Sequence, residues 1–146
     1  MQNFRVCIDA NLALKLVLAE EDSPRVLTLW RRWIENDTLI VAPPLLAYEV
    51  TSVLRGKVHR GVLTAAAGDE AFALIHAQGI EYLAPPTLHS CAWELAKRFA
   101  RPNAYDTHYL ALAEWLTCPF WTADERLYNV VREHLPWVRW LGESLG

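Results

Sequence analysis

Near its N-terminus the chain reads Phe4-Arg5-Val6-Cys7-Ile8-Asp9-Ala10-Asn11, an apolar run that ends on an acid. The run shows no polar alternation and contains β-branched residues, which indicates a strand buried on both faces of a sheet. A helical pattern of apolar residues follows at once. In an open parallel α/β sheet, ligands bind beyond the carboxyl ends of the strands. The sequence therefore predicts that Asp9 lies where such folds carry out chemistry.

The composition is typical of a single globular domain spanning residues 1–146. Hydrophobic residues make up 53% of the chain and charged residues 21%, which is too apolar for a disordered protein. No apolar run approaches the length of a membrane span and the N-terminus has no signal pattern, so we expect no membrane association. The net charge of -3 argues against a protein that coats nucleic acid. It does not exclude a nuclease, whose acids are offset by bound cations.

The cysteines indicate the cellular compartment in which the protein resides. The sequence contains Cys7, Cys91 and Cys118, and their spacing does not match a metal site. Cys7 and Cys118 stand in apolar surroundings, which favours buried free thiols in a reducing environment. We therefore expect a cytoplasmic protein.

Turn and cap signals divide the rest of the chain into alternating strands and helices. Four further strands are expected, at 39–42, 80–84, 119–122 and 137–141. Helices are expected at about 12–18, 25–35, 44–60, 64–77, 87–99 and 107–115, with a brief one near 127–131. Ser23 and Thr87 are expected to cap the helices after them, and Gly61 to end helix 44–60. This order predicts a three-layer α/β/α fold around a mostly parallel sheet of about four to five strands.

Four acids occupy expected strand ends or helix starts, namely Asp9, Glu49, Asp106 and Asp124. Three of them have a simple explanation, because an aspartate at the start of a helix caps backbone N–H groups. Glu49 has no such explanation, since it is expected inside a helix close to the apolar stripe. Four carboxylates at one edge of the sheet would repel and raise each other's pKa unless a cation lay between them.

The chemistry of such a cluster follows from its ligand type. Oxygen ligands without histidine or cysteine suit Mg²⁺ or Mn²⁺ and not zinc. Ions of this kind assist phosphodiester hydrolysis, because they lower the pKa of a bound water and stabilise the charge on the leaving oxygen.

Four motifs together resemble the PIN-domain ribonucleases, and among them the VapC-type toxins of bacterial and archaeal toxin–antitoxin pairs. The motifs are Asp9-Ala10-Asn11 with Lys15, Glu49 preceded by Leu45-Leu46-Ala47-Tyr48, the run from Asp106 to Ala113, and Thr122-Ala123-Asp124. The resemblance covers essentially the whole chain. One departure is Tyr48, which stands where the family commonly has an asparagine.

The resemblance implies an endoribonuclease that depends on Mg²⁺ or Mn²⁺. It assigns the catalytic role to Asp9, Glu49, Asp106 and Asp124, and the metal-ligand role to Asp9, Asp106 and Asp124. Asn11 and Thr122 match small polar positions that support the acids or the metal shell. The resemblance also implies a homodimer and a small antitoxin that lies across helices near the active-site groove. Trp30 and Trp33 are candidates for that groove, and core packing is the alternative for at least one of them.

Cations near these motifs are candidate RNA contacts, namely Lys15, Arg55, Lys57 and Arg60. Each has a simpler interpretation, since Lys15 suits a surface lysine and the other three suit a helix end whose dipole favours cations. Arg101, just before the Asp106 loop, has the same two interpretations.

His108 stands two residues after Asp106 and invites the role of a general base. Two residues along a helix place it on a different side from Asp106. This spacing favours a solvated or packing histidine.

The function hypothesis is therefore an endoribonuclease that cuts RNA with metal-activated water. The alternative is a catalytically idle PIN-like module that acts by binding another protein, and the presence of all four acids counts against it. A receiver-type phospho-acceptor also gathers acids at a parallel sheet edge. It needs an aspartate after the third strand, where this chain has Leu83-Ala84-Pro85, so we discard it.

Overall fold

The structure is a computed structural model that describes residues 4–143. Five strands form one parallel sheet in the order β3-β2-β1-β4-β5. The strands are β1 (Arg5–Ile8), β2 (Leu39–Ala42), β3 (Glu81–Tyr82), β4 (Phe120–Thr122) and β5 (Val138–Trp140). The helices are α1 (Ala10–Val17), α2 (Ser23–Glu35), α3 (Leu45–His59), α4 (Ala65–His76), α5 (Leu88–Arg98), α6 (Tyr105–Leu116) and α7 (Glu125–Val131).

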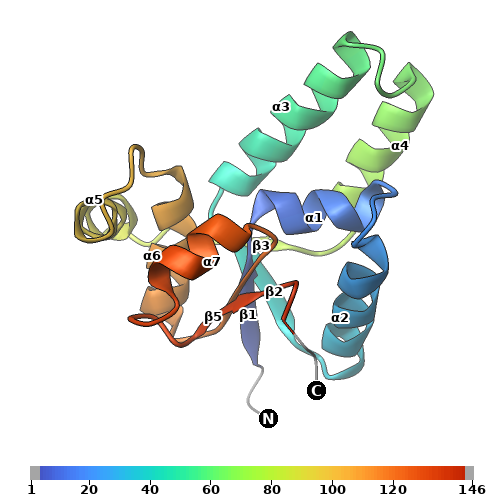
Figure 1. The fold of residues 1–146 in the computed structure, drawn as a ribbon. Coiled ribbons are helices and arrows are strands. Elements are labelled where there is room, and N and C mark those ends of the chain that lie inside the picture. Colours follow the sequence, from blue (N-terminus) through green and yellow to red (C-terminus); the bar gives the residue numbers. More distant parts are fainter. Residues whose placement is uncertain (1–3, 144–146) are drawn as a thin grey trace.

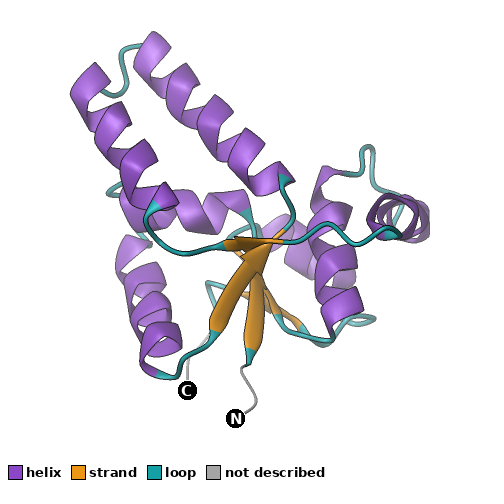
Figure 2. Cartoon of the chain, turned by 180° about the vertical axis from the view of Figure 1, so that it is seen from behind, coloured by secondary structure: helices purple, strands orange, loops and turns teal. Residues whose placement is uncertain are grey.

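The helices cover both faces of the sheet. The chain moves outward from β1 to β2 and β3, then returns past β1 to β4 and continues to β5. Right-handed crossovers in opposite directions place α1 to α4 on one face and α5 to α7 on the other. Figure 1 shows α2 and α5 on opposite sides of the sheet, and the reversed view in Figure 2 agrees. The predicted three-layer α/β/α fold is confirmed.

The direction of the winding changes between β1 and β4, which are neighbours in the sheet. The connection that leaves β1 turns toward β2, and the connection that leaves β4 turns toward β5. Such a switch point leaves a crevice at the carboxyl ends of the two strands, where open α/β folds bind their ligands. Asp9 follows β1 and Asp124 lies two residues after β4. The topology therefore brings Asp9 and Asp124, the first and last of the four acids, to one crevice.

The apolar run quoted from the N-terminus forms the centre of the sheet. Val6, Cys7 and Ile8 are all buried, because β1 has a neighbouring strand on each side and helices on each face. At the opposite extreme, β3 is an edge strand of only two residues, and both Glu81 and Tyr82 are exposed. The strand expected at 80–84 is thus shorter than predicted, since its partner β2 ends at Ala42, the residue that pairs with Tyr82.

Trp30 and Trp33 are both buried in the core under α2. The ring of Trp33 lies between those of Trp30 and Trp121, with centroid distances of 5.8 and 6.3 Å. Trp33 therefore follows the core-packing alternative, because its ring packs α2 on the sheet. Trp30 also lines an apolar groove of about 520 Å³ whose walls come from α1, α2 and the end of α4.

Two of the predicted helix ends differ in detail. Ser23 lies inside the first turn of α2, after Asp22, and its hydroxyl accepts from the Glu20 N–H and donates to the Leu18 carbonyl. It is therefore not the cap that the sequence predicted. Gly61 adopts φ +75° just beyond α3, a conformation that glycine adopts without strain, and this confirms it as the end of the helix.

Cys7 and Cys118 are buried, and all three cysteines are free thiols, as predicted. No helix within residues 4–143 combines the length and the apolar character that crossing a membrane requires.

Candidate active site

Asp9 is the most constrained acid of the site. It directly follows β1 and caps α1, because its Oδ1 accepts the Leu12 N–H at 2.9 Å. Only 8% of the residue is exposed. Burial raises the pKa of Asp9 to about 6, and the negative charge of Asp106 adds to the rise, while hydrogen bonds from Thr122 and two backbone N–H groups oppose it. Capping therefore explains the position of Asp9. It does not offset the free-energy cost of burying the ionised carboxylate.

Thr122 joins the first acid to the last. This residue ends β4 and is fully buried. Its hydroxyl donates to Oδ2 of Asp9 and accepts the backbone N–H of Asp124 at 2.9 Å. A hydroxyl has one donor and two acceptor positions, so Thr122 can make both bonds at once. The predicted supporting role of Thr122 thus has a definite geometry.

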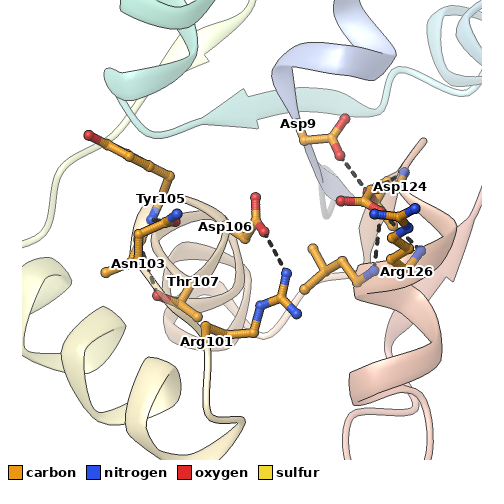
Figure 3. A network of polar contacts seen from close by, with 11 residues as sticks. Asp9, Arg101, Asn103, Tyr105, Asp106, Thr107, Asp124 and Arg126 are labelled. Carbon is orange, nitrogen blue, oxygen red and sulfur yellow. Dashed lines mark hydrogen bonds and ion pairs between the residues drawn. The ribbon is translucent and has the colours of Figure 1, made fainter.

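Asp124 caps α7 through one oxygen, Oδ1, which accepts the N–H groups of Arg126 and Leu127 at 2.9 and 3.2 Å. The second oxygen takes no part in the cap. Figure 3 shows Asp124 at the start of α7, beside the end of the Asp9 side chain.

Asp106 is not a cap, although its position in the sequence allowed one. Helix α6 begins at Tyr105, so Asp106 lies in its first turn. Its Oδ2 forms an ion pair with Nη2 of Arg101 at 3.2 Å. Figure 3 shows the carboxylate of Asp106 directed from α6 toward the side where Asp9 and Asp124 lie. The helix thus presents Asp106 to the crevice.

Glu49 lies in the second turn of α3 and is held from α6. The hydroxyl of Tyr109 donates to Oε1 of Glu49 at 2.7 Å. Partial burial raises the pKa of Glu49 and the charge of Asp106 raises it further, while the bond from Tyr109 opposes this. The effect of Asp106 on both Asp9 and Glu49 shows that these three acids share one electrostatic environment.

The donor chemistry of these acids fits a hard divalent cation. All are oxygen donors, and none of the ion pairs among residues 4–143 includes the buried Asp9. A cation is the compensation that such a charge requires. Within the same residues, however, no three acidic, histidine or cysteine side chains are close enough to hold one ion. Arg101 and the α7 cap engage Asp106 and Asp124 in this conformation.

A groove of about 470 Å³ adjoins Asp124, and Asn11, Lys15, Lys57 and Arg126 line it. Lys15 forms ion pairs with Glu20 at 2.9 Å and Asp22 at 2.8 Å. Of the predicted RNA contacts, the groove therefore brings together Lys15 and Lys57.

The other two predicted cations lie elsewhere on α3. Arg55 lines a separate hollow between α3 and α4, and Arg60 follows the last turn of α3, where its guanidinium lies over Gly56. The four cations do not form one continuous track in this structure.

The sequence did not predict two of the side chains that contact the acids. They are Tyr109 of α6 and Arg101 of the loop before it. The ring of Tyr109 belongs to the core, since only 2% of the residue is exposed. A signal for its hydroxyl was present, because Tyr109 lies three residues after Asp106 and shares its helix face. Arg101 was one of several cations with an open role.

Comparisons with known proteins identify the family to which the chain belongs. The PIN domain family matches residues 6–133. VapC ribonuclease Mb0985 of Mycobacterium bovis is 31% identical over 131 residues, which cover 90% of this chain and 94% of the relative. Ribonuclease VapC9 of Mycobacterium tuberculosis matches with the same identity and coverage. The chain therefore belongs to the PIN-domain family and, within it, to the VapC-type ribonucleases.

Proposed function

We propose that this protein is a metal-dependent endoribonuclease that hydrolyses RNA phosphodiesters and serves as the toxin of a type II toxin–antitoxin system. One observation carries the proposal, namely the buried carboxylate of Asp9, which shares the crevice with Asp106 and is paired with no cationic side chain among residues 4–143. A protein retains such an unfavourable group where function requires it. Family membership supports the reaction class, since the relatives are named ribonucleases.

In this proposal Asp9, Asp106 and Asp124 hold Mg²⁺ or Mn²⁺ at the crevice. The bound ion would supply an activated water and stabilise charge on the leaving oxygen. Thr122 fixes the orientation of Asp9, and Tyr109 fixes that of Glu49. The carboxylate of Glu49, whose pKa is raised, is placed to orient the attacking water and accept its proton.

Cleavage of RNA by the purified full chain tests the proposal. The wild type is incubated with total RNA in Mg²⁺, in Mn²⁺ and in EDTA, beside Asp9→Asn and the matched control Asp69→Asn, an exposed acid of α4. We expect cutting that needs the metal, persists in Asp69→Asn and disappears in Asp9→Asn. Equal cutting by wild type and Asp9→Asn would overturn the site, and no cutting by the wild type would favour the protein-binding alternative.

Thermal unfolding gives a second readout that does not depend on activity. An ion that binds the folded chain raises its melting temperature by mass action. We expect saturating Mg²⁺ or Mn²⁺ to raise the melting temperature of the wild type and of Asp69→Asn. The same additions should leave Asp9→Asn unchanged. A rise of equal size in all three proteins would show that the ion binds away from Asp9.

The biological setting is part of the proposal. An antitoxin partner is supported by the apolar groove between α1, α2 and α4, where Leu27, Ile34 and Leu74 are large apolar residues with 46%, 60% and 42% of their surface exposed. Exposed apolar surface of this kind is typical of protein interfaces. A homodimer and a cytoplasmic location complete the proposal, and the three free thiols suit a reducing compartment. Co-purification of a small partner protein with this chain tests the antitoxin, and sedimentation of the free chain tests the homodimer.

A further inference from the structure

A second pocket lies beside the acids, on the side away from Asp124. Its volume is about 390 Å³, within the rough size range of small-molecule sites in proteins. The walls come from the end of β2, the start of α3, the start of α5 and the first turns of α6. Figure 3 shows Tyr105, which lines this pocket, on the opposite side of Asp106 from Asp124. We call it the tyrosine pocket.

Two tyrosines of this pocket have most of their surface exposed to solvent. Tyr48 is 72% exposed and Tyr105 is 61% exposed. Each is the immediate chain neighbour of an acid of the site, since Tyr48 precedes Glu49 and Tyr105 precedes Asp106. Aromatic faces next to a nuclease centre are suited to stack nucleobases, and such stacking tolerates any base.

Two histidines supply the polar groups of the tyrosine pocket. Nδ1 of His108 bonds to the carbonyl oxygen of Ala104, and Nε2 of His108 bonds to Nδ1 of His89 at 2.8 Å. Because a carbonyl only accepts, His108 carries its proton on Nδ1, and its Nε2 accepts from His89 when both rings are neutral. This assignment follows from the partners, and it leaves Nε2 of His89 as an acceptor. An acceptor of this kind suits the amino or ring N–H of a base.

The pocket and the cation-lined groove flank the acids on opposite sides. The groove presents Lys57 and Arg126 near Asp124, where a phosphate backbone gains from positive charge. The tyrosine pocket is mainly apolar and presents the rings of Tyr48 and Tyr105, which are the chain neighbours of Glu49 and Asp106. A single RNA strand that crosses the acids thus meets cations on one side and aromatic rings on the other.

We propose that the tyrosine pocket binds one nucleobase of the RNA strand, adjacent to the phosphodiester that is cut, by stacking it on Tyr48 and Tyr105. This inference rests on the proposed ribonuclease function and adds to it the site that reads the substrate. The base turns out of the RNA strand to enter the pocket. Its hydrogen-bonding edge then faces His89. A single-stranded segment is required, because a paired base is already stacked within its helix.

The test measures RNA binding by variants that keep the fold. The probe is a fluorescein-labelled single strand of roughly 12 nucleotides, the length that tracks such a surface, with the sequence of the strongest cut site in total RNA. Binding is followed by fluorescence anisotropy on the Asp9→Asn background, so that the strand stays intact. We expect Tyr48→Ala and Tyr105→Ala each to weaken binding roughly tenfold or more, as the loss of one stacked base does. Phenylalanine at either position should restore binding, since it keeps the ring.

The matched control is Trp115→Ala, which removes a ring that is 58% exposed on α6 but does not line the pocket. It should bind like the parent. A loss of the same size in Trp115→Ala would show that any exposed ring matters, and the pocket would lose its assignment.

A probe with one abasic nucleotide locates the base. The probe is made with the base removed at one position at a time, and each form is bound by the parent and by Tyr105→Ala. At one position the two losses should not add, because the base and the ring stack on each other. Additive losses at every position would overturn the proposal.

The outcomes separate this inference from the function on which it rests. In one outcome the wild type cuts RNA while both alanine variants bind the probe with the same affinity as Trp115→Ala. That result keeps the ribonuclease function and rejects the base pocket. If both variants keep RNA binding and instead lose a co-purified antitoxin, the pocket is a protein site and the inference is wrong. If the wild type cuts no RNA, the proposed function fails and the base pocket fails with it.

Discussion

Arg101 forms an ion pair with Asp106, with 3.2 Å between Nη2 and Oδ2, and so joins the loop after α5 to the first turn of α6. The pair holds a proposed metal ligand on a competing cation. Under the proposed function, Arg101 competes with the metal ion for Asp106 and so raises the concentration of free metal that the site needs.

Replacement of Arg101 by glutamine is expected to lower the concentration of Mg²⁺ that gives half-maximal cleavage. A partly exposed ion pair contributes about 0.5 to 1 kcal/mol, so the shift should be roughly two- to fivefold. The measurement is a titration of initial cleavage rate against Mg²⁺. Arg98→Gln is the control, because Arg98 packs over the ring of Phe99 and not on an acid. A higher requirement for Mg²⁺ in Arg101→Gln would mean that the arginine aids metal binding.

Asp9→Asn is expected to abolish cleavage and yet to stabilise the metal-free fold. The pKa of Asp9 is raised from 3.8 to about 6, so the folded chain binds its proton more tightly than the unfolded chain does. Burial of the charge therefore costs stability above about pH 6, and the cost fades as the pH falls toward about 4. By the usual value of about 1.4 kcal/mol per pKa unit, the variant should gain about 2 to 3 kcal/mol at neutral pH.

Urea unfolding in EDTA at several pH values measures this gain. Asparagine keeps an oxygen for the Leu12 cap, so the comparison reports the loss of the charge together with the change at the Thr122 contact. The difference in unfolding free energy between Asp9→Asn and wild type should approach zero at the acid end of the pH range. A variant less stable than wild type at neutral pH would show that the bond from Thr122 outweighs the burial of the charge.

Thr122→Val removes the hydroxyl that serves Asp9 and Asp124 while keeping the shape of the side chain. The carboxylate loses a donor and the Asp124 N–H loses an acceptor in a buried place, at a cost of about 1 to 3 kcal/mol in unfolding free energy. Loss of a group that orients metal ligands typically lowers activity by roughly ten- to a hundredfold. Thr122→Ser keeps the hydroxyl and should retain most of the activity. Equal activity of the valine and serine variants would contradict the bridging role.

Tyr109→Phe keeps the buried ring and removes only the bond to Glu49. Because that bond favours the ionised carboxylate, its loss raises the pKa of Glu49 further. The acid limb of the pH–rate profile for kcat/KM should therefore move to higher pH, while the rate well above that limb changes less. Tyr82→Phe, on the exposed edge strand β3, is the control and should leave the profile in place. A uniform fall in rate at every pH would assign Tyr109 a purely structural role.

The order of strands and helices was predictable because each signal is local. An apolar run such as Val6 to Ile8 marks a buried strand, and prolines and glycines mark where elements stop. Ser23 shows the limit of this information, because its hydroxyl bonds the chain before the helix and the cap falls one residue earlier. The length of β3 depends on pairing with β2, which is a tertiary property.

The four acids were recognisable from the sequence, but their partners were not. Tyr109 reaches Glu49 across 60 positions and Thr122 reaches Asp9 across 113. Contacts of this range arise only when α6 and β4 pack against the first half of the chain. The same holds for the tyrosine pocket, which takes its walls from elements that are far apart in sequence.

The bond between Thr122 and Asp9 also has a consequence for how the protein is made. A ribosome builds the chain from its N-terminus, so Asp9 is synthesised 113 residues before the hydroxyl that positions it. Until β4 is complete, the central strand β1 lacks one of its two neighbours and the crevice lacks a wall. Under the proposed function, a translation product that stops before β4 carries the first acids but not a working site. Under that function, activity begins only after translation has passed β4.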